Sequence, residues 1–378
     1  MSKQLKQSIQ FIGTMATSFE QRLLGGVARY ARMRQPRWQL RWVGAGDAHL
    51  TDTIDGLVVF ALSPQNWTRM RSMNVPMVAT SSRHIGQGVP TVVTDDEAIG
   101  AVAGRFFRDK FYRSFAYFGP DDIPFGPLRG KGFTRSLYPD VVRMIQLTGR
   151  ESAAEREAAL CSSIRNLPPA TAIFAANDVF ARAILEVAEK VGRAIPSDLS
   201  VLGADADELI GLSCPIDLSS VDSRPGEIGY QAAALLDRMI SDPAPVPEDT
   251  VIRIPPGGVV QGSSTDSLAT DDEFILKANA LLKAHACEQD FSLDQLCVLV
   301  GCSRRSLEMR FARFADTGMA GLLWKYRLDR ARELLLTTTL NLAEIAERSG
   351  FRNPYHFSDK FRKVTGQTPG QFRREGGR

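Results

Sequence analysis

The feature that most constrains this chain is a pattern of two short helices around a glycine, which occurs twice near its C-terminus. In the first copy, Ser292 and Gln295 form a capping box before an apolar run, Gly301 ends the run, and Ser303 can cap a second helix. That second helix carries an apolar stripe at helical spacing, namely Leu307, Phe311 and Phe314. A short helix, a glycine turn and another short helix form the helix-turn-helix pattern.

The second copy follows at an offset of 49 residues before the turn and 50 after it. Asn341 and Glu344 form its capping box, Gly350 makes the turn, and Asn353 caps a helix that starts with Pro354. Its apolar stripe comprises Phe357, Phe361 and Val364. One such pattern is a common accident, whereas two matched copies predict a DNA-binding domain with two helix-turn-helix units.

The segment between the two copies supports simultaneous binding to one face of DNA. Met319–Thr337 has a continuous helical pattern, which gives a rod of about 28 Å. Successive major-groove segments on one side of DNA are about 34 Å apart, so both second helices can enter the groove, with a bend in the DNA if the fit is imperfect. From Gly301 onward the chain has 16 Lys and Arg against 8 Asp and Glu, which favours a polyanionic partner.

The C-terminal segment Arg327–Arg374 resembles the AraC/XylS-type DNA-binding domain. The resemblance is carried by Arg327, Ala331, Leu334, Leu335, Ile345, Ala346, Gly350, Phe351, Tyr355, Phe357, Phe361, Gly366, Pro369, Phe372 and Arg373. It extends over about Phe274–Glu375 and implies that the second helix of each unit contacts the bases of double-stranded DNA.

Candidate DNA contacts therefore lie on the exposed faces of these two helices. The groove-facing candidates are Arg304, Arg305, Glu308 and Met309 in the first helix, and Pro354, Tyr355, Ser358 and Asp359 in the second. We expect Asp359 to meet a base amine or to pair with Arg362 or Arg352, because phosphate would repel it. The candidates for phosphate contacts, which position without specifying sequence, are Arg310, Lys360, Arg362 and Lys363. For each charged residue the alternative is a solvated helix face.

The body of the chain alternates strand and helix patterns, which predicts an α/β fold with mostly parallel strands and helices on both faces. The predicted strands are Ile9–Gly13, Gln39–Val43, Gly56–Phe60, Met77–Thr80, Thr91–Val93, Phe115–Phe118, Met144–Leu147, Ala172–Ala175, Ser200–Gly203 and a Pro-Pro-containing strand near Ile254–Val260. The predicted helices include Gln21–Met33, Glu97–Lys110, Glu151–Ile164, Val179–Val191 and Gly226–Ile240. About 260 residues are many for one sheet, so we expect two lobes.

A polar stretch, Ser263–Asp272, separates this body from the helical C-terminus and is predicted to be a linker. We therefore expect an effector-binding domain over residues 1–265, a linker over 266–272 and a DNA-binding domain over 273–378.

The stretch Ala172–Leu209 resembles the effector domain of LacI/GalR-type regulators, which is similar to periplasmic sugar-binding proteins. It has a strand, Asn177-Asp178, a helix, the turn Ile195–Ser200 and a strand that ends in Gly203-Ala204-Asp205. The resemblance implies a small-molecule effector, a monosaccharide, bound between two lobes. A LacI-like body joined to an AraC-type tail also resembles the layout of a bacterial operon activator, which implies a homodimer and RNA polymerase as a partner.

Candidate ligand contacts lie where parallel strands end, since ligands of open α/β sheets bind there. Asp95, Asn177 and Asp205 follow predicted strands, and together with Arg129 they match ligand-contacting positions of the family. Further candidates are Phe19, Glu20 and Asp207. The alternative for Asn177 or Asp178 is that it caps the following helix.

Several other classes of function are not favoured. The sequence has no catalytic motif, no metal-ligand spacing among its five cysteines and four histidines, and no cofactor signature, so we expect no enzyme, metal site or cofactor. It has no apolar run of membrane-spanning length and no apparent signal peptide, so we expect a cytoplasmic protein. Two alternatives stay open: an exported solute-binding protein, and a sensor of a non-sugar ligand that acts as a repressor.

Overall fold

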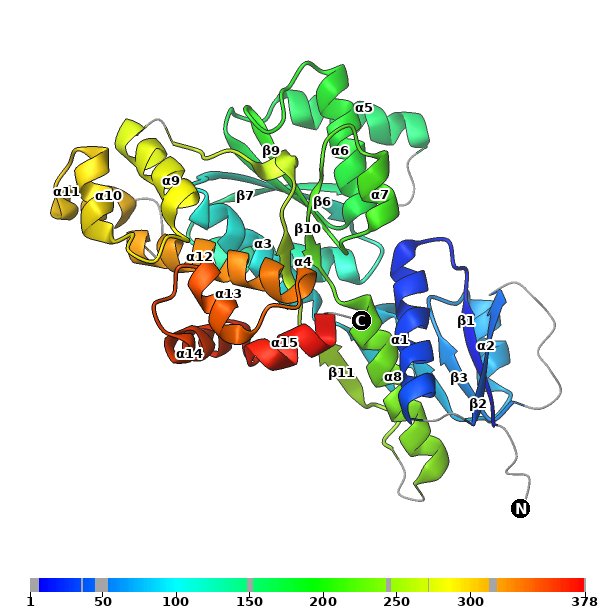
Figure 1. The fold of residues 1–378 in the computed structure, drawn as a ribbon. Helices are drawn as coiled ribbons and strands as arrows, with labels where there is room; N and C mark the ends of the chain where they lie inside the picture. Colours follow the sequence, from blue (N-terminus) through cyan, green and yellow to red (C-terminus); the bar gives the residue numbers. More distant parts are fainter. Residues whose placement is uncertain are drawn as a thin grey trace. The chain divides into compact units, whose positions relative to one another are not determined.

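Contacts divide the computed structural model into two compact units. The structure describes residues 7–34, 37–44, 54–147, 152–242, 246–270, 272–312 and 318–376. The first unit comprises Met1–Phe106 and Arg113–Ser267, and the second comprises Phe107–Tyr112 and Leu268–Arg378. The first is an α/β body and the second is helical, which confirms the predicted fold class (Figure 1).

Two six-stranded sheets form the first unit. The strands of sheet A are β1 (Gln7–Gly13), β2 (Trp38–Gly44), β3 (Gly56–Val59), β4 (Met77–Ala79), β5 (Thr91–Thr94) and β11 (Val251–Ile254). Those of sheet B are β6 (Ser114–Pro120), β7 (Val142–Leu147), β8 (Thr171–Ala175), β9 (Leu199–Ala204), β10 (Ser219–Asp222) and β12 (Gly258–Val260). The orders are β11-β5-β4-β3-β1-β2 and β12-β10-β9-β8-β6-β7. Pairing is parallel except between β10 and β12.

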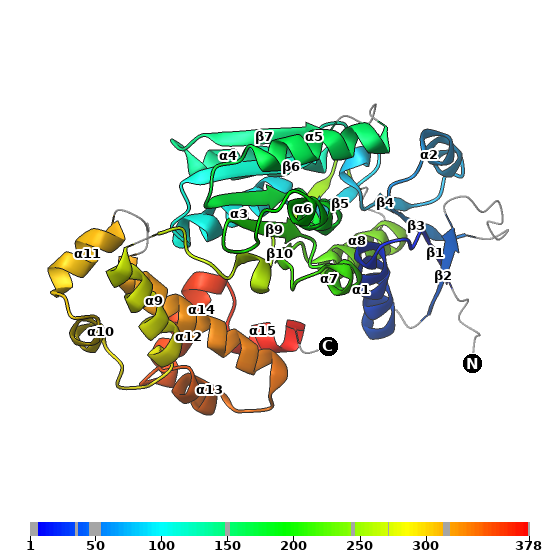
Figure 2. The same cartoon turned by 90° about the horizontal axis from the view of Figure 1, so that it is seen from above.

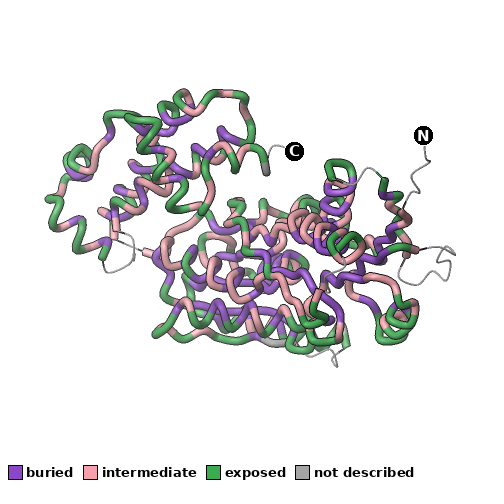
Figure 3. The backbone as a smooth tube through the Cα atoms, turned by 90° about the horizontal axis from the view of Figure 1, so that it is seen from below, coloured by how far each residue is buried: buried purple, intermediate pink, exposed green. Residues whose placement is uncertain are grey.

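Helices cover these sheets and bury their central strands. The helices are α1 (Ser18–Arg34), α2 (Pro64–Arg71), α3 (Asp96–Asp109), α4 (Phe125–Leu137), α5 (Ala153–Arg165), α6 (Asp178–Lys190), α7 (Glu208–Ser213) and α8 (Pro225–Ser241). Every residue of β3 and β8 is buried, as expected for parallel strands with both faces covered. Figure 2 shows the helices beside the strands, and Figure 3 shows the buried stretches of the backbone in purple. Glycines let α1 and α8 approach closely, because a Cβ added at Gly26 would lie 2.0 Å from the Gly226 carbonyl oxygen.

The strand predicted near Ile254–Val260 is in fact two strands in different sheets. Its first part, β11, pairs with β5 of sheet A, and its last part, β12, pairs with β10 of sheet B. Pro255 and Pro256 lie between them, and proline cannot donate a hydrogen bond to a strand ladder. The chain therefore passes between the sheets at this point, after earlier passages through α3 and α8.

The beginning of the polar stretch Ser263–Asp272 packs on sheet B instead of forming a linker. Ser264 and Thr265 are fully buried. The Ser264 hydroxyl donates to the Val201 carbonyl at 2.7 Å and accepts from the Ser219 amide at 2.8 Å. The boundary between the units falls after Ser267, inside the expected linker over residues 266–272.

The second unit is built around one long helix. Its helices are α9 (Glu273–His285), α10 (Leu293–Val300), α11 (Arg304–Ala312), α12 (Gly318–Thr337), α13 (Leu342–Arg348), α14 (Pro354–Thr365) and α15 (Pro369–Gly376). The first part of α12 packs Met319, Leu322 and Leu323 with α9, α10 and α11, and its second part packs Leu328, Ala331, Leu334 and Leu335 with α13 and α14. Each helix-turn-helix unit thus has its own core, and both cores share α12. Across the described stretches, no helix is both long and apolar enough to span a membrane.

The predicted caps and turns of both helix-turn-helix units are confirmed. Ser292 with Gln295 and Asn341 with Glu344 form complete capping boxes. Gly301 and Gly350 have φ values of 86° and 76°, which favour glycine. The predicted stripes are confirmed at their buried phenylalanines and at Leu307. The last residue of the second stripe, Val364, is instead 59% exposed, because it lies in the final turn of α14 beyond the apolar cluster; Phe314 lies outside the described residues.

Candidate ligand pocket and nucleic-acid interface

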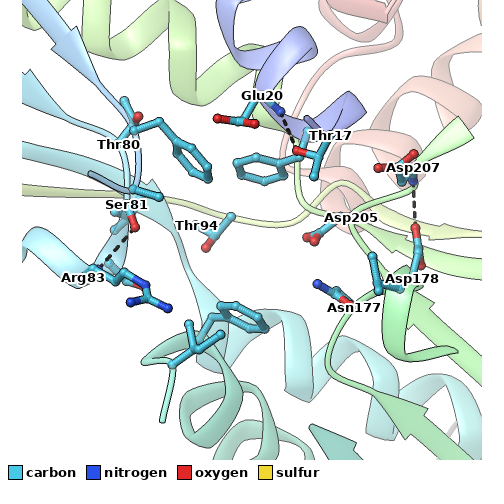
Figure 4. A pocket seen from close by; sticks show the side chains of 18 of the residues that line it. Thr17, Glu20, Thr80, Ser81, Arg83, Thr94, Asn177, Asp178, Asp205 and Asp207 are labelled. Carbon is cyan, nitrogen blue, oxygen red and sulfur yellow. Dashed lines mark hydrogen bonds between the residues drawn. The ribbon is translucent and has the colours of Figure 1, made fainter. Parts of the chain in front are cut away.

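A cavity of about 300 Å³ lies in the first unit where strands of both sheets end. Sheet A and its connections contribute Thr14, Thr17, Phe19, Glu20, Phe60, Ala61, Thr80, Ser81, Ser82, Arg83, Val93 and Thr94. Sheet B and its connections contribute Ile123, Phe125, Arg129, Asn177, Asp178, Val179, Asp205 and Asp207. The volume suits a small molecule, and the place is the one where ligands of open α/β sheets bind. Figure 4 shows Asp205, Asn177 and Arg83 pointing into this cavity from different elements.

A buried arginine between two carboxylates forms the polar floor of the cavity. The Arg129 Nε donates to Asp96 Oδ1 at 2.9 Å, and its Nη2 donates to Asp205 Oδ1 at 3.0 Å. Its Nη1 donates to the Ala176 carbonyl at 2.6 Å. The Arg129 side chain is only 4% exposed, whereas that of Asp205 is 15% exposed. The arrangement offers a carboxylate acceptor and fixed guanidinium donors to one ligand.

Burial and the neighbouring opposite charges shift the pKa values of Arg129 and Asp96 in opposite directions. Burial raises the pKa of Asp96, and the charge of Arg129 opposes that rise. Burial alone would lower the pKa of Arg129, but the charges of Asp205 and Asp96 raise it above its ordinary value. Burial also raises the pKa of Asp178 to about 8, against a hydrogen bond from Ser220 and with a further rise from Asp205.

Of the predicted ligand residues other than Arg129 and Asp205, three also shape the surrounding elements. Asn177 caps α6 by accepting from the Phe180 amide at 3.1 Å, as the alternative interpretation had it, and it also lines the cavity. Asp207 caps α7 through the Ile210 amide at 3.1 Å. Glu20 lines the cavity, yet its oxygens accept from the Thr14 amide, the Thr14 hydroxyl and the Ala16 amide at 2.5–2.9 Å. Glu20 therefore stabilises the loop between β1 and α1.

Asp95 lies outside this cavity. It caps α3 by accepting from the Ala98 amide at 3.0 Å, and it lines a separate hollow with Arg105, Arg135 and Arg253. Its neighbour Asp96 is the residue that contacts Arg129. Asp96 was not among the predicted residues, although it directly follows the predicted Asp95.

Aromatic rings form the apolar walls of the cavity. Phe19, a predicted contact, lies beside Phe60 with ring centroids 5.6 Å apart. Phe125 lies against the guanidinium of Arg129, whose Cζ is 5.1 Å from the ring centroid. Phe60 and Phe125 were not among the predicted contacts, although Phe60 is the last residue of a predicted strand, which was an available signal. Among the residues whose placement is described, no cluster of His, Cys, Asp and Glu could hold a metal ion.

On the first helix-turn-helix unit, the predicted base contacts are exposed on α11. Arg305, Glu308 and the 55% exposed Met309 lie on its outer face. Arg304 donates to Glu308 at 2.9 Å and to Asp294 at 3.1 Å, so part of its charge is paired within the unit.

Arg310 differs from the other predicted phosphate contacts. It pairs with Asp272, and its guanidinium lies 4.4 Å from the centroid of the Phe274 ring. This half-buried arginine holds the start of α9 against α11, which limits its reach toward a phosphate.

On the second unit, Pro354 and Tyr355 are exposed at the start of α14, and Tyr355 is 83% exposed. Ser358 is half-buried on the same helix. Asp359 pairs with Lys363 at 2.9 Å, which lowers the pKa of its carboxyl, and not with Arg362 or Arg352 as predicted. The spacing of four residues explains this choice, because i and i+4 side chains meet on a helix.

Two further basic residues of α14 complete this face. Lys360 places its Nζ 5.2 Å from the centroid of the Trp324 ring, and it is half-buried. Arg362 is exposed. Exposed pairs such as Asp359–Lys363 are weak, so Lys363 stays available to a phosphate.

A buried arginine joins the two helix-turn-helix units. Arg327 of α12 is 7% exposed, and its Nε donates to the Ala286 carbonyl at 2.7 Å. Its Nη2 donates to the Phe291 carbonyl at 3.0 Å. Arg327 thus fixes the connection between α9 and α10 against the middle of the central helix.

Two regions of the chain match known domain families. Residues 105–265 match a family described as a periplasmic binding protein-like domain. Residues 296–375 match a family described as a helix-turn-helix domain.

Similar proteins extend over nearly the whole chain. The xylose operon regulatory protein of Escherichia coli strain K12 is 28% identical over 372 residues, with 94% of each chain covered. That of Haemophilus influenzae is 26% identical over 371 residues, with 94% of this chain and 95% of the relative covered. A solved structure of a xylose-binding transcription activator matches at 26% identity and a TM-score of 0.63 and covers 100% of both chains. A LacI family regulator from Enterococcus faecalis V583 with bound ribose shares the fold of the body, at 22% identity and a TM-score of 0.55 over 69% of this chain and 100% of the regulator.

Proposed function

Because the chain is a transcription regulator that joins a periplasmic-binding-protein-like body to an AraC-type helix-turn-helix domain, we propose that it binds a monosaccharide effector and activates genes of sugar uptake or catabolism. The observation that carries the proposal is the cavity with the Arg129–Asp205 pair on the same chain as two helix-turn-helix units. Carboxylate acceptors and fixed donors suit the hydroxyl groups of a sugar, and phenyl rings suit the apolar faces of its ring.

The names of the relatives support a pentose. The regulatory proteins of Escherichia coli and Haemophilus influenzae are named for the xylose operon, and the matching solved structure is described as xylose-binding. In our proposal the effector binds between the two lobes of the body and alters how two DNA-binding domains of a homodimer engage adjacent sites. The same protein then contacts RNA polymerase, and it acts in the cytoplasm, where the DNA is.

A panel of ligands tests the effector proposal on the full-length protein. We expect one pentose or hexose at about 100 times its Kd to stabilise the body by about 2.7 kcal/mol, a rise in Tm of several degrees. Asp205→Asn should weaken that binding by at least about tenfold, because the carboxylate acceptor is lost. Asp95→Asn is the matched control, since asparagine caps α3 equally well and Asp95 lies outside the cavity.

A flat aromatic effector is the second candidate, because Phe19, Phe60 and Phe125 line the same cavity. The panel therefore includes adenine and guanine. A Tm shift with a purine and none with any sugar would replace the sugar proposal with this one, and a regulator of that kind would be tested for repression.

Two variants test the DNA-binding face. Their affinities are measured on a DNA site selected from a random library and on other sequences. Arg305→Ala should weaken binding to the selected site by about 1–3 kcal/mol and relax the preference at one base pair. Lys363→Ala should weaken binding evenly on all sequences and reduce the salt slope by about one. A uniform loss for both variants would contradict the base contact of Arg305.

A further inference from the structure

The loop that carries Asp205 is held in a strained conformation. It follows β9 and spans Asp205–Asp207, where Asp205 has a φ of 99° and Ala206 a φ of 49°. Both values lie in the left-handed region that residues with a side chain disfavour. The surroundings must therefore hold the loop, and they do so from two sides.

Groups of the lobe that contains sheet B bind the three backbone amides of the loop. The Asp205 amide donates to the Val221 carbonyl at 2.8 Å, and the Ala206 amide donates to the Ser220 hydroxyl at 2.9 Å. The Asp207 amide donates to Asp178 Oδ2 at 2.7 Å (Figure 4). All three amides are thus bound within the lobe to which the loop belongs.

A glycine makes this arrangement possible. A Cβ added at Gly203 would lie 2.1 Å from Asp178 Oδ1, so any larger residue there would displace the carboxylate. Asp178 is 2% exposed, and its Oδ1 accepts from the Ser220 hydroxyl at 2.6 Å. The loop therefore rests on a rigid, buried support.

The other lobe holds the carbonyls of the same loop. Arg22 lies on α1, which belongs to the lobe of sheet A. Its Nη1 donates to the carbonyl oxygens of Asp205 and Ala206, each at 3.0 Å. Its Nη2 donates to Asp222 Oδ1 at 2.9 Å, at the end of β10 just before the chain crosses back toward sheet A. The Arg22 guanidinium thus connects the lobe of sheet A to the lobe of sheet B.

These contacts link the relative position of the two lobes to Asp205, the proposed ligand residue. Arg22 is not among the residues that line the cavity, so it acts on a ligand only through the loop. The carboxylate of Asp205 faces the cavity (Figure 4). Its carbonyl oxygen accepts a hydrogen bond from Arg22. A ligand that fixes this carboxylate and an arginine that fixes this carbonyl each favour the same arrangement of the lobes, which makes them cooperative.

We propose that Arg22 is a positioning residue that latches the Asp205–Asp207 loop across the cleft and so sets the affinity for the effector. This inference rests on the proposed function for its effector. The latch itself does not, because it can be measured on the protein without any ligand.

The first test is hydrogen–deuterium exchange on the unliganded full-length protein. Arg22→Met should speed exchange of the amides of Asp205, Ala206 and Asp207 by about tenfold. Arg29→Met is the matched control on the same helix, since Arg29 pairs with Glu227 at 3.5 Å within its own lobe. Equal protection of the loop in Arg22→Met and the unaltered protein would overturn the latch.

The second test measures binding of the sugar that raises the Tm in the panel. We expect Arg22→Met to weaken it by about five- to twentyfold, mainly through faster dissociation, while Arg29→Met binds normally. The affinity of Arg22→Lys for the sugar should lie between those of Arg22→Met and the unaltered protein. An ammonium group cannot bind both carbonyls and Asp222 with the geometry of a guanidinium.

A second-site change separates positioning from a general structural role. Glycine adopts the φ of Ala206 without strain, so Ala206→Gly should restore part of the affinity of Arg22→Met. Unchanged affinity in Arg22→Met would overturn the proposal, as would a loss that Ala206→Gly leaves untouched. If no sugar binds but the exchange result holds, the effector proposal fails and the latch stands.

Discussion

Replacement of Arg129 by methionine is expected to destabilise the first unit by about 3–5 kcal/mol and to abolish effector binding. The change leaves the buried carboxylate of Asp96, whose side chain is 1% exposed, without its counter-charge. Its other oxygen, Oδ2, already has no hydrogen-bond partner within the described residues. Urea unfolding followed by tryptophan fluorescence measures the loss, in a Trp324→Phe background that leaves Trp38, Trp42 and Trp67 as reporters of this unit.

The pH dependence of this variant identifies the cause. Burial raises the pKa of Asp96 above its ordinary value, and loss of Arg129 raises it further. The folded state then binds the proton more tightly than the unfolded state, so stability is gained as pH falls toward the ordinary range of Asp. The deficit should therefore be smaller at pH 5 than at pH 8, and a second change, Asp96→Asn, should remove most of it.

A matched arginine change provides the control. Arg182 pairs with Glu186 at 3.5 Å on the surface of α6, so Arg182→Met should change stability by no more than about 0.5 kcal/mol. A similar small loss in Arg129→Met, with the same value at both pH conditions, would show that the buried cluster does not depend on this ion pair.

Local signals in the sequence were sufficient for most of the fold. A capping box needs only two residues at a fixed spacing, so Ser292 with Gln295 was recognisable without tertiary information. The buried state of Ser264 and Thr265 was not, because their polar side chains resemble those of a linker until the backbone of sheet B is present to bond with them. The break at Pro255-Pro256 could not be predicted for the same reason. It is recognisable only once β11 is seen to pair in sheet A and β12 in sheet B.

Most of the ligand residues proposed from the sequence line the cavity, but one neighbouring aspartate and one long-range pairing could not be proposed from it. Six of the seven proposed ligand residues line the cavity, because the carboxyl ends of parallel strands meet at one edge. Asp95 does not, since successive positions at a helix start differ by about 100° in direction and only Asp96 turns toward Arg129. The pairing of Arg310 with Asp272 joins residues 38 apart, so spacing within one helix could not reveal it.

Replacement of Phe357 by alanine is expected to destabilise the second helix-turn-helix unit by about 3–5 kcal/mol. Phe357 is fully buried, with its ring centroid 5.1 Å from that of Phe351 and 5.6 Å from that of Phe361. Loss of the ring removes the centre of a small aromatic core that holds α14 against α12. Trp324 lies 5.7 Å from Phe351 by the same measure, so its fluorescence reports on this core directly.

The expected effect on DNA follows from the sharing of α12 by two cores. The first core keeps Met319, Leu322 and Leu323, so α11 should stay folded and continue to bind its half of the site. Footprints of Phe357→Ala should therefore shrink to the segment contacted by α11, with lower affinity. Tyr355→Ala is the control on the same helix: Tyr355 is 83% exposed, so this variant should weaken DNA binding while the Trp324 unfolding transition stays in place. Loss of both halves of the footprint in Phe357→Ala would mean that the two cores fold as one cooperative unit through α12.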